Sequence, residues 1–402
     1  MSHPPLLRLA GLLAALAPAA LFASGIRTGF KDAGATAAGN AFAATADSPA
    51  AIYYNPAGLT QLDGSSISAS VYAVQLQTDF ASPAGAGTHM KRDTHLLPQF
   101  YYAYAPHGAN YALGLGAYVP FGLSTSWSPT SGFDTIATDA SIKDYAISAV
   151  GAWKITPELS LGAGPVFHQI SSKLSRSIDT TSTDIFTFDG SNQAVSFNAG
   201  LRWQPSEKHA FGLSYQSNYS SRLTGTSTFT PFTGGVPASA SFTLPEVIIA
   251  GYSYRPTPDW NLEVNLEWTN WDRVNAINIQ NSSVVFSPAE TLVLNWRSGF
   301  NYDFGVTRQL GNGLHVSAGF TYSQNSTPTS TYNPAVPDAN RELVGLGLGG
   351  HVGGCELQLT LQYGFADTRT VTGVPVNFAG QTPNGTYSSR TYALAFALSH
   401  RF

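Results

Sequence analysis

The chain has 402 residues, of which 11% are charged and 12% are aromatic, and its formal net charge is −4 at pH 7. So few charges, without a basic excess, argue against nucleic acid or an acidic substrate as a partner. The single cysteine, Cys355, excludes an internal disulfide. Sparse charge with many aromatic and glycine residues is typical of strands that have one face in lipid and the other in a lumen.

Residues 1–23 have the layout of a secretory signal peptide. Arg8 precedes an apolar run that ends near Ala23, and the run is too short to span a membrane as a helix. We expect cleavage after Ala23, so that the mature protein begins near Ser24 and leaves the cytoplasm. No later stretch has the roughly eighteen continuous apolar residues that a membrane helix needs.

Residues 24–64 are rich in Ala and Gly and lack the alternation of a strand. Small residues let short helices and turns pack closely, so this segment is predicted to fold as a plug, or hatch. It would lie inside a barrel formed by residues 65–402. A barrel of about fourteen strands leaves a lumen that side chains alone do not fill, so a selective pore of this size needs a plug.

Short turn signals alternate with long Ser/Thr/Gly/Pro-rich stretches along residues 65–402. The short turns are expected near residues 106–109, 156–157, 205–208, 256–259, 306–312 and 353–354, and the long loops near 79–94, 120–142, 171–193, 223–241, 274–289, 324–341 and 367–390. Thirteen connections join fourteen strands. An even strand number with short turns at one end and long loops at the other is typical of a bacterial outer-membrane barrel.

Alternation within the strands assigns their faces. In residues 260–269, 292–303 and 356–365, apolar side chains alternate with polar ones, so the apolar face is predicted to meet lipid and the polar face to line the lumen. Aromatic residues near the predicted strand ends are expected to form a girdle at the headgroup level: Trp153, Trp203, Tyr254, Trp260, Trp271 and Phe402.

The stretch 392–402 alternates in the same way and is predicted to be the closing strand. We therefore predict an all-β fold: a 14-stranded antiparallel transmembrane β-barrel with an N-terminal helical hatch in its lumen, in the bacterial outer membrane. Its expected partners are outer-membrane lipid, lipopolysaccharide and the barrel-assembly machinery, which would read the strand ending in Phe402. A closed barrel has no free edge that needs a partner, so we predict a monomer.

The chain resembles the FadL family of outer-membrane transporters for long-chain fatty acids and other hydrophobic compounds. The most distinctive block is residues 47–60, which contains Asn55-Pro56-Ala57. Further blocks that carry the likeness are Leu244-Pro-Glu246, residues 260–271 and residues 336–341. The resemblance implies that a hydrophobic small-molecule ligand is collected between the long loops. It would then reach a pocket touching the hatch and leave sideways at a kinked third strand.

On this resemblance, the third strand lies at about residues 110–119, and Gly114 and Gly116 are candidates for its kink because glycine tolerates unusual backbone angles. Glycines in strands also merely relieve crowding. Asn55, Pro56 and Ala57 are candidates for hatch movement, with a purely structural turn as the alternative.

Apolar ligand contacts are predicted from Ile26 and Phe30 in the hatch and from Phe121 and Leu123 near the third strand. A carboxylate ligand needs a cation, and strand parity points Arg202 and Arg297 into the lumen. Both arginines are equally explained as partners of lumenal acids: Glu263, Glu267 and Asp303.

The predicted function is passive, diffusion-driven uptake of long-chain fatty acids or similar hydrophobic compounds. Import of aromatic or alkane hydrocarbons, a general porin and a structural barrel remain alternatives. The chain lacks a Gly-x-Ser-x-Gly element, so no enzyme activity is expected. No cofactor is expected either, and no metal site, since His89, His95 and His107 are dispersed.

Overall fold

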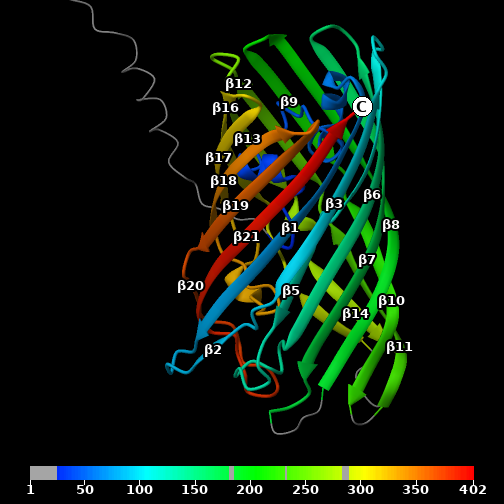
Figure 1. Cartoon of the computed structure of the whole chain (residues 1–402). Coiled ribbons are helices and arrows are strands. Elements are labelled where there is room, and N and C mark those ends of the chain that lie inside the picture. Colours follow the sequence, from blue (N-terminus) through cyan, green and yellow to red (C-terminus); the bar gives the residue numbers. More distant parts are fainter. Residues whose placement is uncertain (1–24, 181–184, 231–232, 283–288) are drawn as a thin grey trace, which may run out of the picture.

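The computed structural model describes residues 25–180, 185–230, 233–282 and 289–402. The predicted signal peptide and Ser24 lie outside the described residues. The described strands form a closed antiparallel barrel of fourteen strands (Figure 1). The last strand, β21, pairs with the first, β1, from Ser66↔Arg401 to Ala81↔Thr386, and this pairing closes the barrel.

Consecutive strands pair along the barrel, and five of the fourteen are interrupted once. Their bounds are β1 (Gly64–Ala81), β3 (Thr94–Ala105), β4 (Tyr111–Tyr118) with β5 (Gly122–Ser126), β6 (Asp139–Lys154), β7 (Leu159–Ser177), β8 (Ile185–Ser206), β9 (His209–Gln216) with β10 (Tyr219–Thr230), β11 (Thr233–Leu244) with β12 (Val247–Tyr254), β13 (Trp260–Thr269) with β14 (Ala276–Asn281), β15 (Ala289–Val293) with β16 (Gly299–Gly311), β17 (Leu314–Ser323), β18 (Arg341–Val352), β19 (Cys355–Ala366) and β21 (Gly385–Arg401). Short strands β2 (Gly87–His89) and β20 (Arg369–Val371) extend two hairpins.

The predicted faces of β13, β19 and β21 are confirmed. Leu262, Leu361 and Phe396 are 42%, 59% and 45% exposed on the outside, whereas Glu263 and Thr360 on the inside are at most 2% exposed. Alternating polarity therefore places apolar side chains toward lipid and polar ones toward the hatch. Within the described residues, no helix has the length and apolar character needed to cross a membrane.

Two predicted long loops are mostly strand. β7 continues to Ser177 and β8 begins at Ile185, inside the stretch 171–193 that was predicted as loop. β10 and β11 likewise fill most of 223–241. Their Ser and Thr residues alternate with Phe and Leu, and pairing with a neighbour satisfies the backbone, so these hairpins extend the barrel at the end away from the C-terminus (Figure 1).

The stretch 292–303 is not the single strand that its alternation predicts. It is interrupted at 294–298, between β15 and β16, where Asn295 has a φ of 46°. Leu294 and Trp296 are both 4% exposed and point inward instead of meeting lipid. Trp271, expected in the aromatic girdle, is also completely buried in the interior, in a short 3₁₀ helix, η3 (Trp271–Arg273), that interrupts the preceding strand.

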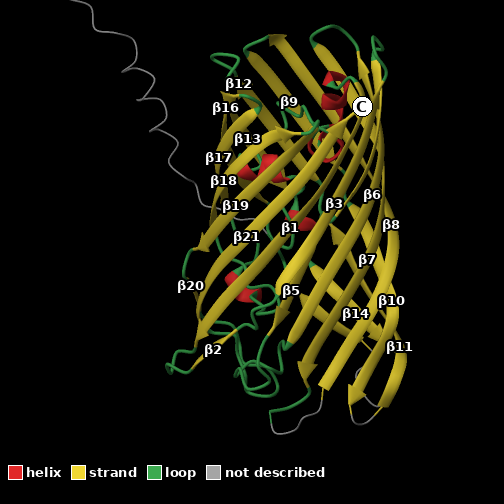
Figure 2. Cartoon of the chain, viewed as in Figure 1, coloured by secondary structure: helices red, strands yellow, loops and turns green. Residues whose placement is uncertain are grey.

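The hatch is described from Gly25 and ends where β1 begins. Its short helices α2 (Ala33–Ala37), α3 (Ala51–Tyr54) and η2 (Pro56–Gln61) lie inside the barrel (Figure 2). Small residues allow this close packing: a Cβ on Gly319 of β17 would lie 2.0 Å from the Gly39 backbone nitrogen. Ala38 and Gly39 of the hatch thus lie against a glycine of the wall, and the two backbones come into contact.

Candidate functional site

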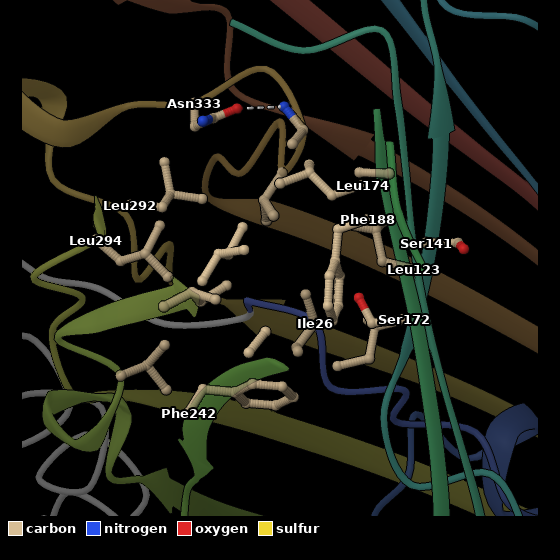
Figure 3. Close-up of a pocket in the computed structure, with 18 of the residues that line it drawn as sticks. Ile26, Leu123, Ser141, Ser172, Leu174, Phe188, Phe242, Leu292, Leu294 and Asn333 are labelled. Carbon is tan, nitrogen blue, oxygen red and sulfur yellow. Dashed lines mark hydrogen bonds between the residues drawn. The ribbon is translucent and has the colours of Figure 1, made fainter. Parts of the chain in front are cut away.

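An apolar cavity lies between the hatch and the long-loop end of the barrel. It contains about 940 Å³ of empty space, including the part open to solvent. Figure 3 shows side chains converging on it from the hatch, several strands and the loop after β17. The lining includes Ile26, Leu123, Ile142, Leu174, Phe188, Leu223, Phe242, Leu244, Val274, Ile277, Ile279, Leu292, Leu294, Trp296 and Val336. Among the described lining residues, Lys173 alone carries a charge, and it is exposed.

The interrupted strands supply the hatch-side end of this cavity. The Trp271 ring packs at 5.1 Å from the Trp296 ring and at 6.1 Å from the Phe121 ring, measured between centroids. A Cβ on Gly25 would lie 2.6 Å from Trp271, so the start of the hatch rests against this aromatic group. The interruptions therefore turn bulky residues inward, and Ile26 of the hatch lines the same cavity.

The third strand is interrupted at residues 119–121, between β4 and β5. Residues 100–104 of β3 pair with 113–117 of β4, but in the described ladder residues 94–99 of β3 pair with β1 alone. β5 pairs with β6. In the described residues no ladder joins β3 to β5 on the long-loop side of the break, and the Lys91 nitrogen, just before β3, donates to the Ser126 carbonyl of β5 at 2.8 Å.

The two glycines that were predicted as the kink lie before the break in the third strand. Gly114 and Gly116 lie in the regular part of β4. A Cβ on Gly114 would lie 2.6 Å from Ile52, and one on Gly116 would lie 2.9 Å from the same side chain. Both glycines make room for the hatch, and the break begins three residues beyond Gly116.

Residues 26–28 of the hatch, which we call the strap, lie across this break. The Thr28 backbone nitrogen donates to the Pro120 carbonyl at 3.0 Å, and the Gly122 nitrogen donates to the Ile26 carbonyl at 2.9 Å. Arg27 and Phe121 face each other in an isolated antiparallel bridge. The strap therefore satisfies backbone groups that the missing ladder leaves unpaired.

A buried ion pair holds the strap to the opposite wall. The Arg27 guanidinium lies 2.5 Å from the Glu267 carboxylate, and both side chains are 6% exposed. Arg27 also donates to the Tyr53 hydroxyl at 2.9 Å. The nearby Lys31 amine donates to the Thr28 carbonyl, and its burial lowers the pKa of Lys31 well below its ordinary value.

Asn55, Pro56 and Ala57 are completely buried against the barrel wall. The Asn55 amide donates to the Ala43 carbonyl at 2.7 Å and to the Leu201 carbonyl of β8 at 3.0 Å, and it accepts from the Ala57 nitrogen at 3.2 Å. Wall glycines make room for this turn. These contacts fasten the hatch to β8.

The other predicted ligand residues divide into two groups. Ile26 and Leu123 line the cavity, and Phe121 packs in the aromatic group at its end. Phe30 does not reach it and instead stacks on Tyr72 at 4.6 Å between ring centroids.

Neither predicted carboxylate partner lines the cavity. Arg202 is buried under the hatch and donates to the Ala44 carbonyl at 2.7 Å. Arg297 is exposed in the break between β15 and β16. Glu263 accepts from the Ala44 and Thr45 nitrogens at 2.8 and 2.9 Å, so the lumenal charges near the hatch bind its backbone.

A polar group beside the strand break was missed by the sequence analysis. His168 Nδ1 lies 3.0 Å from Asp144, and Nε2 lies 2.8 Å from the Ser196 hydroxyl. The Tyr219 hydroxyl donates to Asp144 at 2.5 Å, and the Asp144 nitrogen donates to the Phe121 carbonyl at 3.1 Å. The sequence did contain a signal for this group, since each of three successive strands has a polar residue at a lumenal position. Only the register between the strands shows that these residues lie side by side.

No cluster of three or more metal-ligating side chains is found in the part of the chain that the structure describes.

Comparisons with known proteins agree with this architecture. The family described as outer membrane protein transport protein (OMPP1/FadL/TodX) matches residues 13–402. The long-chain fatty acid transport protein of Escherichia coli is 20% identical over 354 residues, which cover 74% of this chain and 77% of that protein.

Two solved structures share the fold. A Pseudomonas aeruginosa FadL homologue matches with a TM-score of 0.84 and 17% identity, over 94% of this chain and 100% of that one. The Ralstonia pickettii toluene transporter TbuX matches with a TM-score of 0.71 and 18% identity, over 93% and 98%. Since the family match extends over nearly the whole chain, the chain belongs to the OMPP1/FadL/TodX family of outer membrane transport proteins.

Proposed function

We propose that this protein carries hydrophobic compounds passively into the outer membrane and releases them sideways between β3 and β5. One observation carries the proposal: the strap that ends the apolar cavity at Ile26 is also the segment that covers the break in the third strand. Release of the strap would connect the cavity with the unpaired wall. Sideways release keeps the ligand out of water, which costs about 0.8 kcal/mol per exposed CH₂.

In this proposal, the two ends of the hatch have different roles. Asn55-Pro56-Ala57 anchors the hatch, since the turn is buried and bonded to β8. The strap is the moving part in this proposal, because its bonds to the third strand, made by residues 26 and 28, lie at the break itself. No covalent step is required, so a concentration gradient drives transport.

The cavity binds its ligand through the hydrocarbon body. Its lining is apolar. Lys173 is the one charged residue among the described lining residues, and its side chain is exposed. Long-chain fatty acids and similar compounds fit this lining, and so do aromatic or alkane hydrocarbons. The E. coli relative is a fatty acid transport protein and TbuX is a toluene transporter, so both ligand classes belong in the test.

The test is a reversible lock on the strap. Arg27→Cys and Phe121→Cys are combined in a background with Cys355→Ser and Glu267→Met, since positions 27 and 121 face each other across a bridge. Glu267→Met removes the acid that Arg27→Cys would leave buried without its cation. Cells without a transporter of their own receive the variant, and uptake of labelled oleate and toluene is measured. We expect the oxidised lock to abolish saturable uptake and a reductant to restore it.

The controls are the two single-cysteine variants, which cannot cross-link within the chain and whose uptake oxidation leaves unchanged. Equal uptake by the locked and the reduced protein would refute strap release as the route. Absence of saturable uptake by the unmodified protein would favour a structural barrel.

A further inference from the structure

The group formed by Asp144, His168, Tyr219 and Ser196 lies at the third-strand break, where the proposed route leaves the barrel. Asp144 and His168 are completely and 95% buried, respectively, and the His168 and Tyr219 rings stack at 4.0 Å between centroids. The Asp144 carboxyl group accepts from the Tyr219 hydroxyl and hydrogen-bonds to His168 Nδ1, so this buried polar group has two partners within the group. Ser196 is the half-buried end of this chain of hydrogen bonds.

A second, smaller cavity adjoins the group. It contains about 340 Å³ of empty space, a volume that includes the part open to solvent. Phe121 borders it on the side of the break, and His168, Ser196 and Ser217 border it on the side of β7, β8 and the interruption after β9. Phe121 also packs on Trp271, and Trp271 packs on Trp296 in the lining of the apolar cavity, so this aromatic group lies between the two cavities.

Ser196 keeps hydrogen-bonding capacity for a ligand whether the His168 Nε2 atom or the serine hydroxyl is the donor in their hydrogen bond. If Nε2 accepts, the serine hydroxyl donates to it, and the serine oxygen can accept a second hydrogen. If Nε2 donates, the serine hydroxyl can donate to a ligand. A group that both donates and accepts, such as a hydroxyl or a protonated carboxyl, fits both cases. A carboxylate would add a second negative charge close to buried Asp144.

We propose that Ser196, held by His168 and Asp144, is a binding site for the uncharged polar head of an otherwise apolar ligand, such as a long-chain alcohol. The head group hydrogen-bonds to Ser196 while the hydrocarbon tail passes Phe121 toward the break. This site rests on the proposed function, since the ligand must reach it from the apolar cavity. It adds selectivity for a head group that the apolar cavity does not recognise.

The test compares saturable uptake of 1-dodecanol and dodecane by cells that carry the full-length protein. Ser196→Ala removes the hydroxyl, Ser196→Thr retains it, and Ser175→Ala is the control. Ser175 pairs with Thr187 between the same two strands, at 3.0 Å, and lines neither cavity. We expect Ser196→Ala to raise the concentration for half-maximal dodecanol uptake about fivefold, as loss of one hydrogen bond requires. Dodecane uptake stays the same, and Ser196→Thr and Ser175→Ala behave like the parent.

Three results would overturn the proposal while leaving the transport function intact. They are an equal change for both compounds, no change for either, and failure of Ser196→Thr to restore dodecanol uptake in a correctly folded barrel. Modification of Ser196 by a fluorophosphonate, with ester hydrolysis, would also overturn it and make the serine a nucleophile. Absence of saturable dodecane uptake by the parent would instead refute the proposed function itself.

Discussion

At the residue scale, the barrel wall is shaped to receive the hatch. A Cβ on Gly200 would lie 2.1 Å from the Asn55 Oδ1 atom, and one on Gly162 would lie 2.6 Å from the Ala57 nitrogen. Both glycines face the same buried turn from neighbouring strands, β8 and β7. Side chains at these two positions would push the turn off the wall, so the glycines and the Asn55 turn form one contact.

Gly200→Ala is expected to loosen the hatch, because the methyl group overlaps Asn55 and overpacking costs about 1–3 kcal/mol. The measurement is ion conductance of the purified barrel in planar bilayers, where a displaced hatch raises the frequency of openings. Gly234→Ala is the matched control, since nothing lies within 4 Å of a Cβ there. Equal conductance of the two variants would contradict the assigned contact.

Asn55→Ala is expected to make the barrel leaky. The change leaves the Ala43 and Leu201 carbonyls without the Asn55 donor in a buried place, at a cost of about 1–3 kcal/mol. Sensitivity of cells to a large antibiotic that the intact outer membrane excludes reports the leak. If Asn55 instead moved during transport, the variant would lose uptake of oleate and keep its barrier.

At the element scale, interrupted strands build the site. The breaks at 119–121 and 294–298 open the wall beside β3 and turn Leu294 and Trp296 into the cavity. The strap compensates for the first break by backbone hydrogen bonds and is held from the opposite side by Arg27 on Glu267. These bonds hold the strap over the proposed exit.

Arg27→Met is expected to detach the strap, because it leaves Glu267 buried without its cation at a cost of about 3–5 kcal/mol. The double variant Arg27→Met, Glu267→Met replaces the pair by apolar side chains and is expected to recover most of this loss. Protease cleavage within the first residues of the folded protein measures strap release. Additive effects of the two substitutions would show that the pair is not what holds the strap.

At the scale of the whole molecule, the closed barrel holds the apolar cavity toward its long-loop end and the anchored hatch toward its other end.

Ala240 lines the cavity and is 2% exposed, so Ala240→Trp is expected to fill part of the ligand space. Uptake of oleate and toluene is expected to fall together, at least tenfold. Val195→Trp, on a 60% exposed outer position, is the control. Unchanged uptake by Ala240→Trp would place the route elsewhere.

Alternating polarity was sufficient to predict the barrel. Local sequence pattern was enough to predict three features. These are the faces of residues 260–269 and 356–365, the pairing of the last strand with the first, and the Ala/Gly-rich hatch. The physical reason is that lipid on one side and a packed lumen on the other impose period two on every strand residue. The number of strands then followed from the turns.

The site depended on contacts between distant parts of the chain. Leu294 and Trp296 continue an alternating pattern but face inward, because the chain turns at Asn295. Strand parity predicts that Arg202 points into the lumen, where it could bind a ligand, but its side chain donates to the hatch backbone. Asp144, His168 and Ser196 come together through strand register alone. The sequence by itself determined a plugged outer-membrane barrel, whereas the cavity, the strap and the polar group at the break arose only where the hatch met the wall.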